Sequence, residues 1–190
     1  MSPGHGPEIR IANRGDIPEL RAALAGFLGK TSAELARNGD SIDKVVAAPE
    51  HLVLVADGPP ILGFITVSFR TVVRFPWPVA EIDELFVAEA SRREGVARKL
   101  TDAAREAAAA RGVGRLFVAS NVSRHAAQSF YESMGFTRYG AHFRTTVPPD
   151  NSALRFEQPH DSLGGHLRVA EPIDHEMVDG SAGVVDELAK

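Results

Sequence analysis

Hydrophobic and polar residues follow recognisable periods along the first 147 residues of the chain. Residues 8–12 alternate between the two classes, which predicts a strand. A helix is predicted next, because Asp16 can cap it, Pro18 suits its first turn and one of its faces is apolar. The residues of that face are Ile17, Leu20, Leu24, Phe27 and Leu28.

The remaining elements follow from apolar runs that end at turn-forming residues. Further helices are predicted at residues 31–48 (interrupted near 38–39), 98–111 and 124–134, and further strands at 51–57, 61–70, 79–87, 115–120 and 136–147. The second and third strands make a hairpin, whereas the strand, helix and strand over residues 79–120 require a parallel pair. The predicted fold class is therefore α/β, with a mixed, mostly antiparallel central sheet and helices on both faces.

The composition changes after residue 147. Prolines and glycines interrupt residues 148–190 and would break any long element there. We therefore expect one domain over residues 1–147 and an acidic, Pro- and Gly-containing extension over residues 148–190. The extension is either a flexible or surface-draped segment, or a substrate lid or an arm that contacts a second copy.

Charge is distributed unevenly along the 190 residues. The chain has 21 basic and 25 acidic side chains, but residues 145–190 carry nine acids and only three bases. Residues 92–124 carry eight bases and three acids, so this segment favours an anionic partner. Few aromatic residues interleave with these bases, and the C-terminal segment is acidic, so nucleic acid is not the expected partner.

The absence of cysteine excludes disulfides, thiolate zinc sites and a cysteine nucleophile, and it suits a reducing cytoplasm. No apolar run approaches the ~18 residues of a membrane helix, and the N-terminus lacks the apolar centre of a signal peptide. The histidines of the extension are irregularly spaced, so no metal site is expected. These observations predict a cytoplasmic protein that contacts no membrane.

The segment after the strand at residues 79–87 carries the most informative chemical pattern. A turn with Arg92 and Arg93 leads through Gly95 and Ala97 into a long helix. Exposed amides at such a helix N-terminus can bind phosphate oxygens, and small residues let a ligand approach the backbone. Spacing alone equally allows an ordinary tight turn before a solvated, basic helix. The pattern is neither a Walker A loop nor GxGxxG.

Three motifs follow one another along this part of the chain. Leu85-Phe86-Val87 ends a predicted strand, Arg92-x-x-Gly95-x-Ala97 opens a helix, and Ala127-x-x-Phe130-Tyr131-x-x-x-Gly135-Phe136 lies on the next helix and its end. They resemble the Leu-x-Val, Gln/Arg-x-x-Gly-x-Gly/Ala and Ala-x-x-Phe/Leu-Tyr-x-x-x-Gly-Phe motifs of the GNAT superfamily of acetyl-CoA-dependent N-acetyltransferases. The resemblance covers roughly residues 8–146.

The resemblance implies the GNAT fold, with acetyl-CoA as the co-substrate whose phosphates the basic segment would attract. The amides from Arg93 to Arg98 would cradle the pyrophosphate, and Phe86 and Val87 would pair with the pantetheine arm as a pseudo-strand. The implied cofactor-binding set is Leu85, Phe86, Val87, Arg92, Arg93, Glu94, Gly95, Val96, Ala97, Arg98, Asn121, Arg124 and Tyr131. Arg93 stands where many members carry Gly, and Arg124 where an Asn often begins the last motif, so the exact phosphate contacts stay open.

The implied reaction is direct transfer of the acetyl group to a primary amine, which must first lose its proton. A carboxylate is a suitable base, and Glu84, then Glu81, is the favoured candidate, with Asp83 between them. Simple alternation puts Glu81 and Asp83 on one face and Glu84 on the other, and a bulge would disturb it. Tyr131 matches the family's general acid for the departing thiolate, and the Val87 amide matches its oxyanion donor.

The sequence does not identify the acceptor amine or the pocket that binds it. Phe75 and Trp77 either line the acceptor pocket or anchor a hydrophobic loop, and residues 31–46 are where family members vary to admit different acceptors. A non-catalytic acetyl-CoA-binding sensor is the alternative function, and retention of the two glutamates and the tyrosine favours the enzyme. Family members are often dimers, so a homodimer is one expected state.

Overall fold

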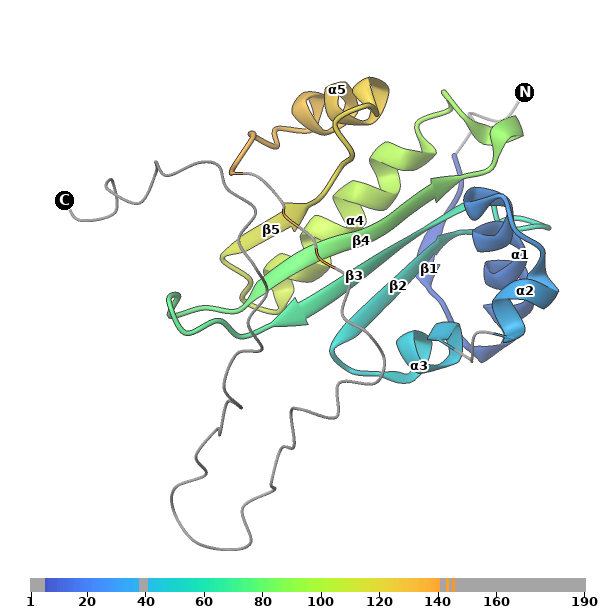
Figure 1. The fold of residues 1–190 in the computed structure, drawn as a ribbon, viewed down its shortest axis with the longest axis horizontal. Coiled ribbons are helices and arrows are strands. Elements are labelled where there is room, and N and C mark those ends of the chain that lie inside the picture. The colour runs from blue at the N-terminus through green and yellow to red at the C-terminus, as the bar shows by residue number, and fades with distance from the viewer. Residues whose placement is uncertain (1–5, 38–40, 141–142, 144, 146–190) are drawn as a thin grey trace, which may run out of the picture. The chain divides into compact units, whose positions relative to one another are not determined.

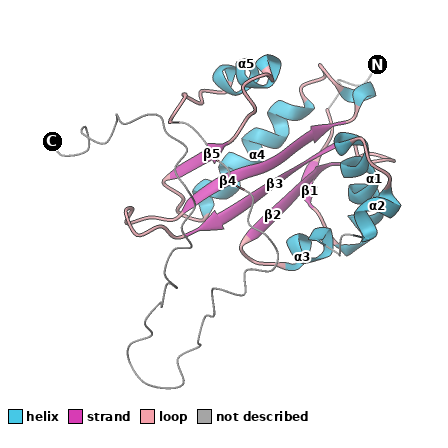
Figure 2. Cartoon of the chain, in the orientation of Figure 1, coloured by secondary structure: helices cyan, strands magenta, loops and turns pink. Residues whose placement is uncertain are grey.

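The computed structural model describes residues 6–37, 41–140, 143 and 145, which form a twisted sheet flanked by helices (Figure 1 and Figure 2). In chain order, the strands are β1 (Ile9–Ile11), β2 (His51–Ala56), β3 (Gly63–Arg70), β4 (Val79–Val87) and β5 (Arg115–Val118). The α-helices are α1 (Ile17–Leu28), α2 (Ser32–Arg37), α3 (Ser41–Ala47), α4 (Val96–Ala110) and α5 (His125–Ser133). Short 3₁₀ turns occur at Arg14–Asp16 and Glu89–Ser91.

The five strands form one sheet in the order β1-β2-β3-β4-β5. The first three pairings are antiparallel, whereas β4 and β5 run parallel and are joined through α4. A parallel neighbour requires a crossover of this kind, and antiparallel neighbours need only turns or short connections. The predicted fold class, a mixed and mostly antiparallel sheet with helices on both faces, is confirmed.

Each face of the sheet has its own hydrophobic core. On one face, α4 packs Val96, Leu100 and Ala104 against buried side chains of β2, β3 and β4. On the other face, α1 and α3 lie over β2 and β3. The buried residues of that second core are Ala12, Leu20, Val53, Val55, Ile61 and Phe64. Because β2 is covered on both faces, its apolar run is continuous and its alternate side chains enter opposite cores.

The start of α1 differs from its prediction in the capping group. Asp16 is the N-cap residue of α1, but its side chain makes no capping hydrogen bond. The side chain of Asn13 caps the preceding 3₁₀ turn and accepts a hydrogen bond of 2.7 Å from the Gly15 amide. The Asp16 carboxylate instead accepts two hydrogen bonds of 2.8 Å from the Arg10 guanidinium, and this interaction lowers the pKa of Asp16. Arg10 thereby ties β1 to the turn that precedes α1.

Several predicted elements have different bounds or are absent; β3 begins two residues later than predicted and β5 ends two residues earlier. The helix predicted at residues 31–48 is two helices, α2 and α3, and residues 38–40 between them lie outside the described residues. Helix α4 begins two residues before its predicted start. The strand predicted at 136–147 is not found in residues 136–140, 143 or 145, since Gly140 adopts a left-handed conformation (φ 71°) that interrupts an extended backbone. The predicted domain boundary at residue 147 and the extension at 148–190 lie outside the described residues.

Phe75 and Trp77 anchor the loop before β4. Their rings stack with centroids 6.0 Å apart, and the Arg115 guanidinium lies over the Phe75 ring at 5.0 Å. The Trp77 ring packs directly against Gly114, whose amide donates a hydrogen bond to Pro78. These contacts are at the start of β4, so the loop-anchor interpretation holds for both aromatic residues.

Gly114→Ala should destabilise the protein by about 1–3 kcal/mol, the usual cost of overpacking. A Cβ at this position would lie 2.0 Å from the Trp77 ring, so either the ring or the backbone must move. Gly26→Ala is the matched control, because its Cβ would meet nothing within 4 Å and alanine favours the helix by about 1 kcal/mol. Urea unfolding should give changes of opposite sign, and equal midpoints for the two variants would contradict this packing.

Candidate active site

Strand β4 loses its neighbour on one side in its C-terminal half. The parallel pairing with β5 runs from Val79 to Ile82 of β4, and residues 83–87 extend beyond the last paired position. On the opposite side, β3 stays paired to the end of β4. The two parallel strands therefore part at the point where the predicted site begins, and one edge of β4 is left without a strand partner among the described residues.

The backbone of β4 presents polar groups to this open edge. The Ala88 amide donates a hydrogen bond of 2.9 Å to the Leu62 carbonyl on the β3 side. Because strand residues alternate in direction, the amides and carbonyls of Leu85 and Val87 point to the other side. The Arg92 side chain donates to the Val87 carbonyl at 3.3 Å, which agrees with that direction.

The start of α4 lies just beyond this edge. Within the described residues no side chain caps it, and its helical series begins with Lys99 donating to Gly95 at 3.0 Å, so the first amides of the helix have no intrahelical acceptor. Gly95 is the N-cap and adopts a left-handed conformation (φ 81°). The residues from Arg92 to Gly95, and Arg98, are exposed. Free amides and the positive end of the helix dipole together make an anion-binding position.

Arg93 also adopts a left-handed conformation, with φ 67°, which explains why glycine suits this position of the motif. Arg93→Gly should raise the free energy of unfolding by about 0.5–1 kcal/mol, because the relief of backbone strain exceeds the entropic cost of glycine. Arg98→Gly removes the same side chain from the first turn of α4 and should cost about 1 kcal/mol. Guanidinium unfolding compares the two, and a destabilised Arg93→Gly variant would show that the backbone is not strained there.

A β-bulge at Asp83 rearranges the carboxylates of β4. In the register with β3, Thr66 faces Glu84 and Ser68 faces Glu81, so β4 has one extra residue between the two pairs. Since Thr66 and Ser68 are two residues apart, their partners lie on one face of the sheet. The prediction from simple alternation, which placed Glu84 on the face opposite Glu81, is wrong because of this bulge.

Glu81 and Asp83 each contact a side chain from the C-terminal half of β3. Glu81 forms an ion pair of 2.8 Å with Arg70, and the hydroxyl of Ser68 donates to the Asp83 carboxylate at 3.0 Å. The protein around the Asp83 carboxyl excludes part of its water and raises its pKa, and the Ser68 hydrogen bond opposes that rise. Glu81 therefore has a cationic partner, which leaves it less suited than Glu84 to accept a proton.

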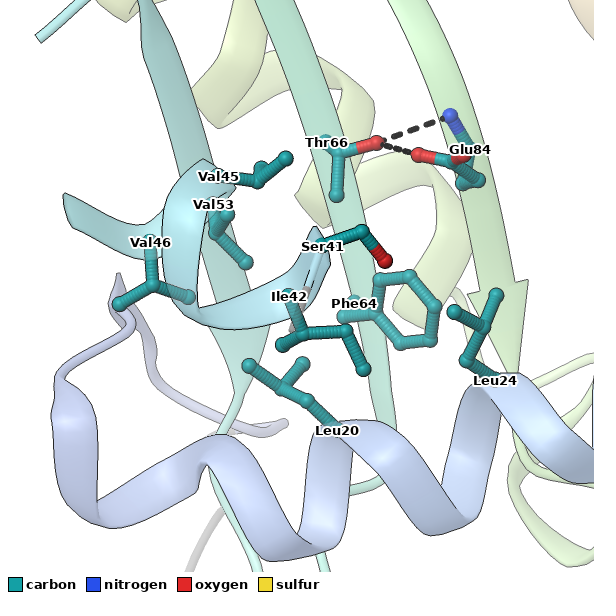
Figure 3. A pocket seen from close by; sticks show the side chains of 10 residues that line it. All are labelled: Leu20, Leu24, Ser41, Ile42, Val45, Val46, Val53, Phe64, Thr66 and Glu84. Carbon is teal, nitrogen blue, oxygen red and sulfur yellow. Dashed lines mark hydrogen bonds between the residues drawn. The ribbon is translucent and has the colours of Figure 1, made fainter. Parts of the chain in front are cut away.

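Glu84 borders a cavity of about 130 Å³ between the sheet, α1 and α3 (Figure 3). Its carboxylate accepts a hydrogen bond from the Thr66 hydroxyl, and that hydroxyl accepts one from the Glu84 amide at 3.0 Å. Both groups come from facing positions of β3 and β4, so the strand pairing itself fixes the orientation of the carboxylate. The other lining residues are Leu20, Leu24, Ser41, Ile42, Val45, Val46, Val53 and Phe64.

Tyr131 lies on α5 in an aromatic cluster. Its ring makes edge contacts with Phe130 and Phe136, at centroid distances of 5.3 and 5.5 Å. Burial of the side chain raises the pKa of Tyr131, and the positive charge of Arg124 partly opposes this. The hydroxyl makes no hydrogen bond within the described residues. Tyr131 is therefore a protonated, unengaged phenol at neutral pH.

The start of α5 is held near the ends of α1 and β4. The guanidinium of Arg124 lies 5.2 Å from the centre of the Phe27 ring, and Phe27 contacts Phe86 of β4. The side-chain oxygen of Asn121 accepts hydrogen bonds from the amide and hydroxyl of Ser123, at 3.0 and 2.9 Å. Asn121 thus shapes the turn before α5.

The structure brings most of the predicted residues together around the end of β4. Leu85, Phe86, Val87 and the loop at residues 92–98 border the open edge, and Glu84 enters the cavity, whereas Glu81 lies in the part of β4 that pairs with β5. Tyr131 does not line that cavity. Thr66 was not among the predicted site residues. Its position as a polar residue inside an apolar strand, opposite Glu84, is the sequence signal that could have indicated it. The cavity was not predicted either, since only the packing of α1 and α3 on the sheet creates it.

No helix among the described residues is long and apolar enough to cross a membrane. They also contain no group of three or more histidine, aspartate and glutamate side chains that could hold a metal ion.

Comparison with known proteins agrees with this architecture. The model of the acetyltransferase (GNAT) family matches residues 24–136, whereas no protein with a curated description matches the chain. Among solved structures, a transcriptional regulator from Bacillus halodurans C-125 is similar at 22% identity and a TM-score of 0.67, covering 74% of this chain and 99% of its own. An aminoglycoside 6'-N-acetyltransferase from Acinetobacter haemolyticus is similar at 18% identity and a TM-score of 0.63, covering 75% and 99%.

The sheet, its parted strands and the family match together define an enzyme of the N-acetyltransferase class. The chain belongs to the acetyltransferase (GNAT) family.

Proposed function

We propose that the protein transfers the acetyl group of acetyl-CoA directly to a primary amine, in the cytoplasm. The observation that supports this most strongly is the open edge of β4 beside the uncapped N-terminus of α4. An extended pantetheine arm needs backbone hydrogen-bond partners such as those on the open edge of β4. A pyrophosphate needs hydrogen-bond donors such as the amides at the start of α4. The two features are adjacent in the chain and in space, as one elongated ligand requires.

The residues present fit acetyl-CoA in charge as well as in shape. Arg92, Arg93 and Arg98 are exposed around the free amides and can neutralise phosphate oxygens. On the open edge, Leu85 and Val87 direct their backbone groups outward, so we expect these two residues to pair with the pantetheine arm, with Phe86 supporting them from the sheet. Asn121 and Arg124 border the same region from the start of α5.

The protein's own groups then perform the proton transfers. Glu84 takes a proton from the acceptor amine, because it is the carboxylate in a cavity and is free of the ion pair that engages Glu81. The nitrogen forms a bond to the acetyl carbon as the carbon–sulfur bond breaks, and the Val87 amide stabilises the charge on the acetyl oxygen. Tyr131, whose raised pKa keeps it protonated, gives a proton to the departing thiolate.

Acetyl-CoA should raise the melting temperature of the protein by several degrees. A ligand at about 100 times its Kd adds about 2.7 kcal/mol to the free energy of unfolding, because it binds only the folded state. The shift should be smaller for Gly95→Val, since a branched side chain strains the φ of 81° and crowds the free amides. An unchanged melting temperature at millimolar acetyl-CoA would remove the cofactor from this proposal.

Release of CoA with a panel of amines tests the transfer itself. The panel should contain monoamines, polyamines, amino acids and peptides, and also amino sugars, because a structurally similar protein is an aminoglycoside 6'-N-acetyltransferase. A sensor would bind acetyl-CoA and release CoA with no amine. The carboxylate in a cavity beside the open edge supports the enzyme over the sensor, which has no need of a base.

A further inference from the structure

The cavity beside Glu84 has an almost entirely apolar wall. Seven of its lining residues are aliphatic or aromatic: Leu20, Leu24, Ile42, Val45, Val46, Val53 and Phe64. They come from α1, α3, β2 and β3, and in Figure 3 they surround the space in front of the Thr66–Glu84 pair. A ligand in this space gains free energy from its hydrocarbon parts and not from hydrogen bonds.

The polar groups of the cavity are few, and they differ in what they can still bind. Ser41 and Thr66 contribute hydroxyls, and the Thr66 proton is already donated to Glu84. Glu84 is the one charged lining residue, and no lysine, arginine or histidine among the described residues forms an ion pair with it. A carboxylate in an apolar wall favours one cationic partner, such as a single ammonium group.

The packing of α3 leaves this space unfilled by the described residues. The apolar residues Ile42, Val45 and Val46 face the sheet, yet α3 contributes no buried residue. The lining residues Leu20, Val53 and Phe64 are buried, so the partly exposed part of the wall is the side formed by α3 and Leu24. Apolar side chains that stay partly exposed around a hollow leave area for a ligand to cover.

The volume sets the size of the group that fits. An apolar cavity of about 150 Å³ is large enough to bind benzene, and this one has about 130 Å³. It therefore accommodates a branched chain or a ring of roughly six carbon atoms. A second ammonium or several hydroxyls on that group would lose their water and find no partners on the apolar wall.

We propose that the acceptor is a primary monoamine with a compact hydrocarbon body, held with its nitrogen at Glu84 and its body against α1 and α3. This rests on the proposed acetyl transfer and narrows it to one substrate class. The ammonium nitrogen gives one proton to Glu84, then attacks and gains the acetyl group, and loses a second proton as the amide forms. Tyr131 protonates the departing sulfur of CoA and regains a proton from the nitrogen, so the step balances with Glu84 carrying the one proton released. The apolar lining of the cavity disfavours molecules that carry several positive charges.

The test compares benzylamine and isopentylamine with spermidine and an amino sugar, by CoA release at fixed acetyl-CoA. We expect kcat/KM for the two compact monoamines to exceed that for the polycations by at least about tenfold, a usual margin for an apolar pocket. Val45→Phe should fill the cavity and lower kcat/KM for benzylamine by about tenfold or more, with the acetyl-CoA melting shift retained. Val73→Phe is the control, because Val73 is fully exposed and lies outside the cavity.

The possible outcomes distinguish failure of the monoamine class from failure of acetyl transfer itself. A preference for spermidine or the amino sugar, or a Val45→Phe variant with unchanged kcat/KM for benzylamine, would overturn the monoamine class and leave acetyl transfer standing. Bound acetyl-CoA without CoA release for any amine would overturn acetyl transfer itself, and the acceptor class with it.

Discussion

Replacing Glu84 by glutamine should lower kcat by about 10²- to 10⁴-fold, the range expected for loss of a general base. Glutamine keeps the size of the side chain and can still accept a hydrogen bond from Thr66, so the cavity should keep its shape. The glutamine amide cannot accept a proton from the ammonium group of the acceptor. The acidic limb of the kcat/KM profile, which reports protonation of the base, should flatten, while the acetyl-CoA melting shift stays as in the wild type.

Glu81→Gln is the matched control for this experiment. Glu81 lies on the same strand and the same face, but its carboxylate is paired with Arg70 at 2.8 Å. Its replacement removes an ion pair whose arginine side chain is half exposed. Ion pairs of this kind contribute only about 0–1 kcal/mol to the free energy of unfolding. A larger loss of kcat in Glu81→Gln than in Glu84→Gln, with the acidic limb intact in the latter, would reverse the assignment of the base.

Tyr131→Phe should lower kcat by about 10²-fold or more, with little change in acetyl-CoA affinity. The substitution removes only the hydroxyl, which makes no hydrogen bond within the described residues, and keeps the ring contacts with Phe130 and Phe136. The free energy of unfolding should therefore hardly change. Tyr139→Phe is the control, because Tyr139 is the other tyrosine of the chain and is 63% exposed.

The pH dependence of the reaction provides a second check on Tyr131. A tyrosine acts as an acid only while protonated, and burial raises the pKa of Tyr131 above its ordinary value of 10.0. The basic limb that depends on this group should therefore begin above the ordinary range of tyrosine and be missing in Tyr131→Phe. A basic limb that is the same in both proteins, or unchanged turnover in the variant, would remove Tyr131 from the acid role.

Much of the fold could be predicted because short-range patterns determine it. Strand β4 has its predicted bounds, since Pro78 precedes it and apolar residues occupy its first half and its end. Helix α4 began earlier than predicted, because Gly95 in a left-handed conformation is an N-cap that only the backbone reveals. The parallel pairing of β4 with β5 followed from the helix between them.

The arrangement of the site depended on contacts that no short-range pattern reports. The bulge at Asp83 sets the face of Glu84, and the long connection between β3 and β4 does not fix their register as a two-residue turn would. The cavity arises where α3 packs loosely over β2 and β3, which depends on the whole assembly. Phe75 and Trp77 had two interpretations, and only the position of Gly114 decided between them.

The proposed acetyl transfer from acetyl-CoA to a primary amine, with Glu84 as the base, is tested most directly by mass spectrometry of a reaction with benzylamine and acetyl-CoA labelled in the acetyl group. We predict one labelled N-acetylbenzylamine for each CoA released, at a rate about 100-fold or more lower in Glu84→Gln and little changed in Glu81→Gln. CoA release without labelled amide, or equal rates of amide formation in Glu84→Gln and the wild type, would contradict the claim.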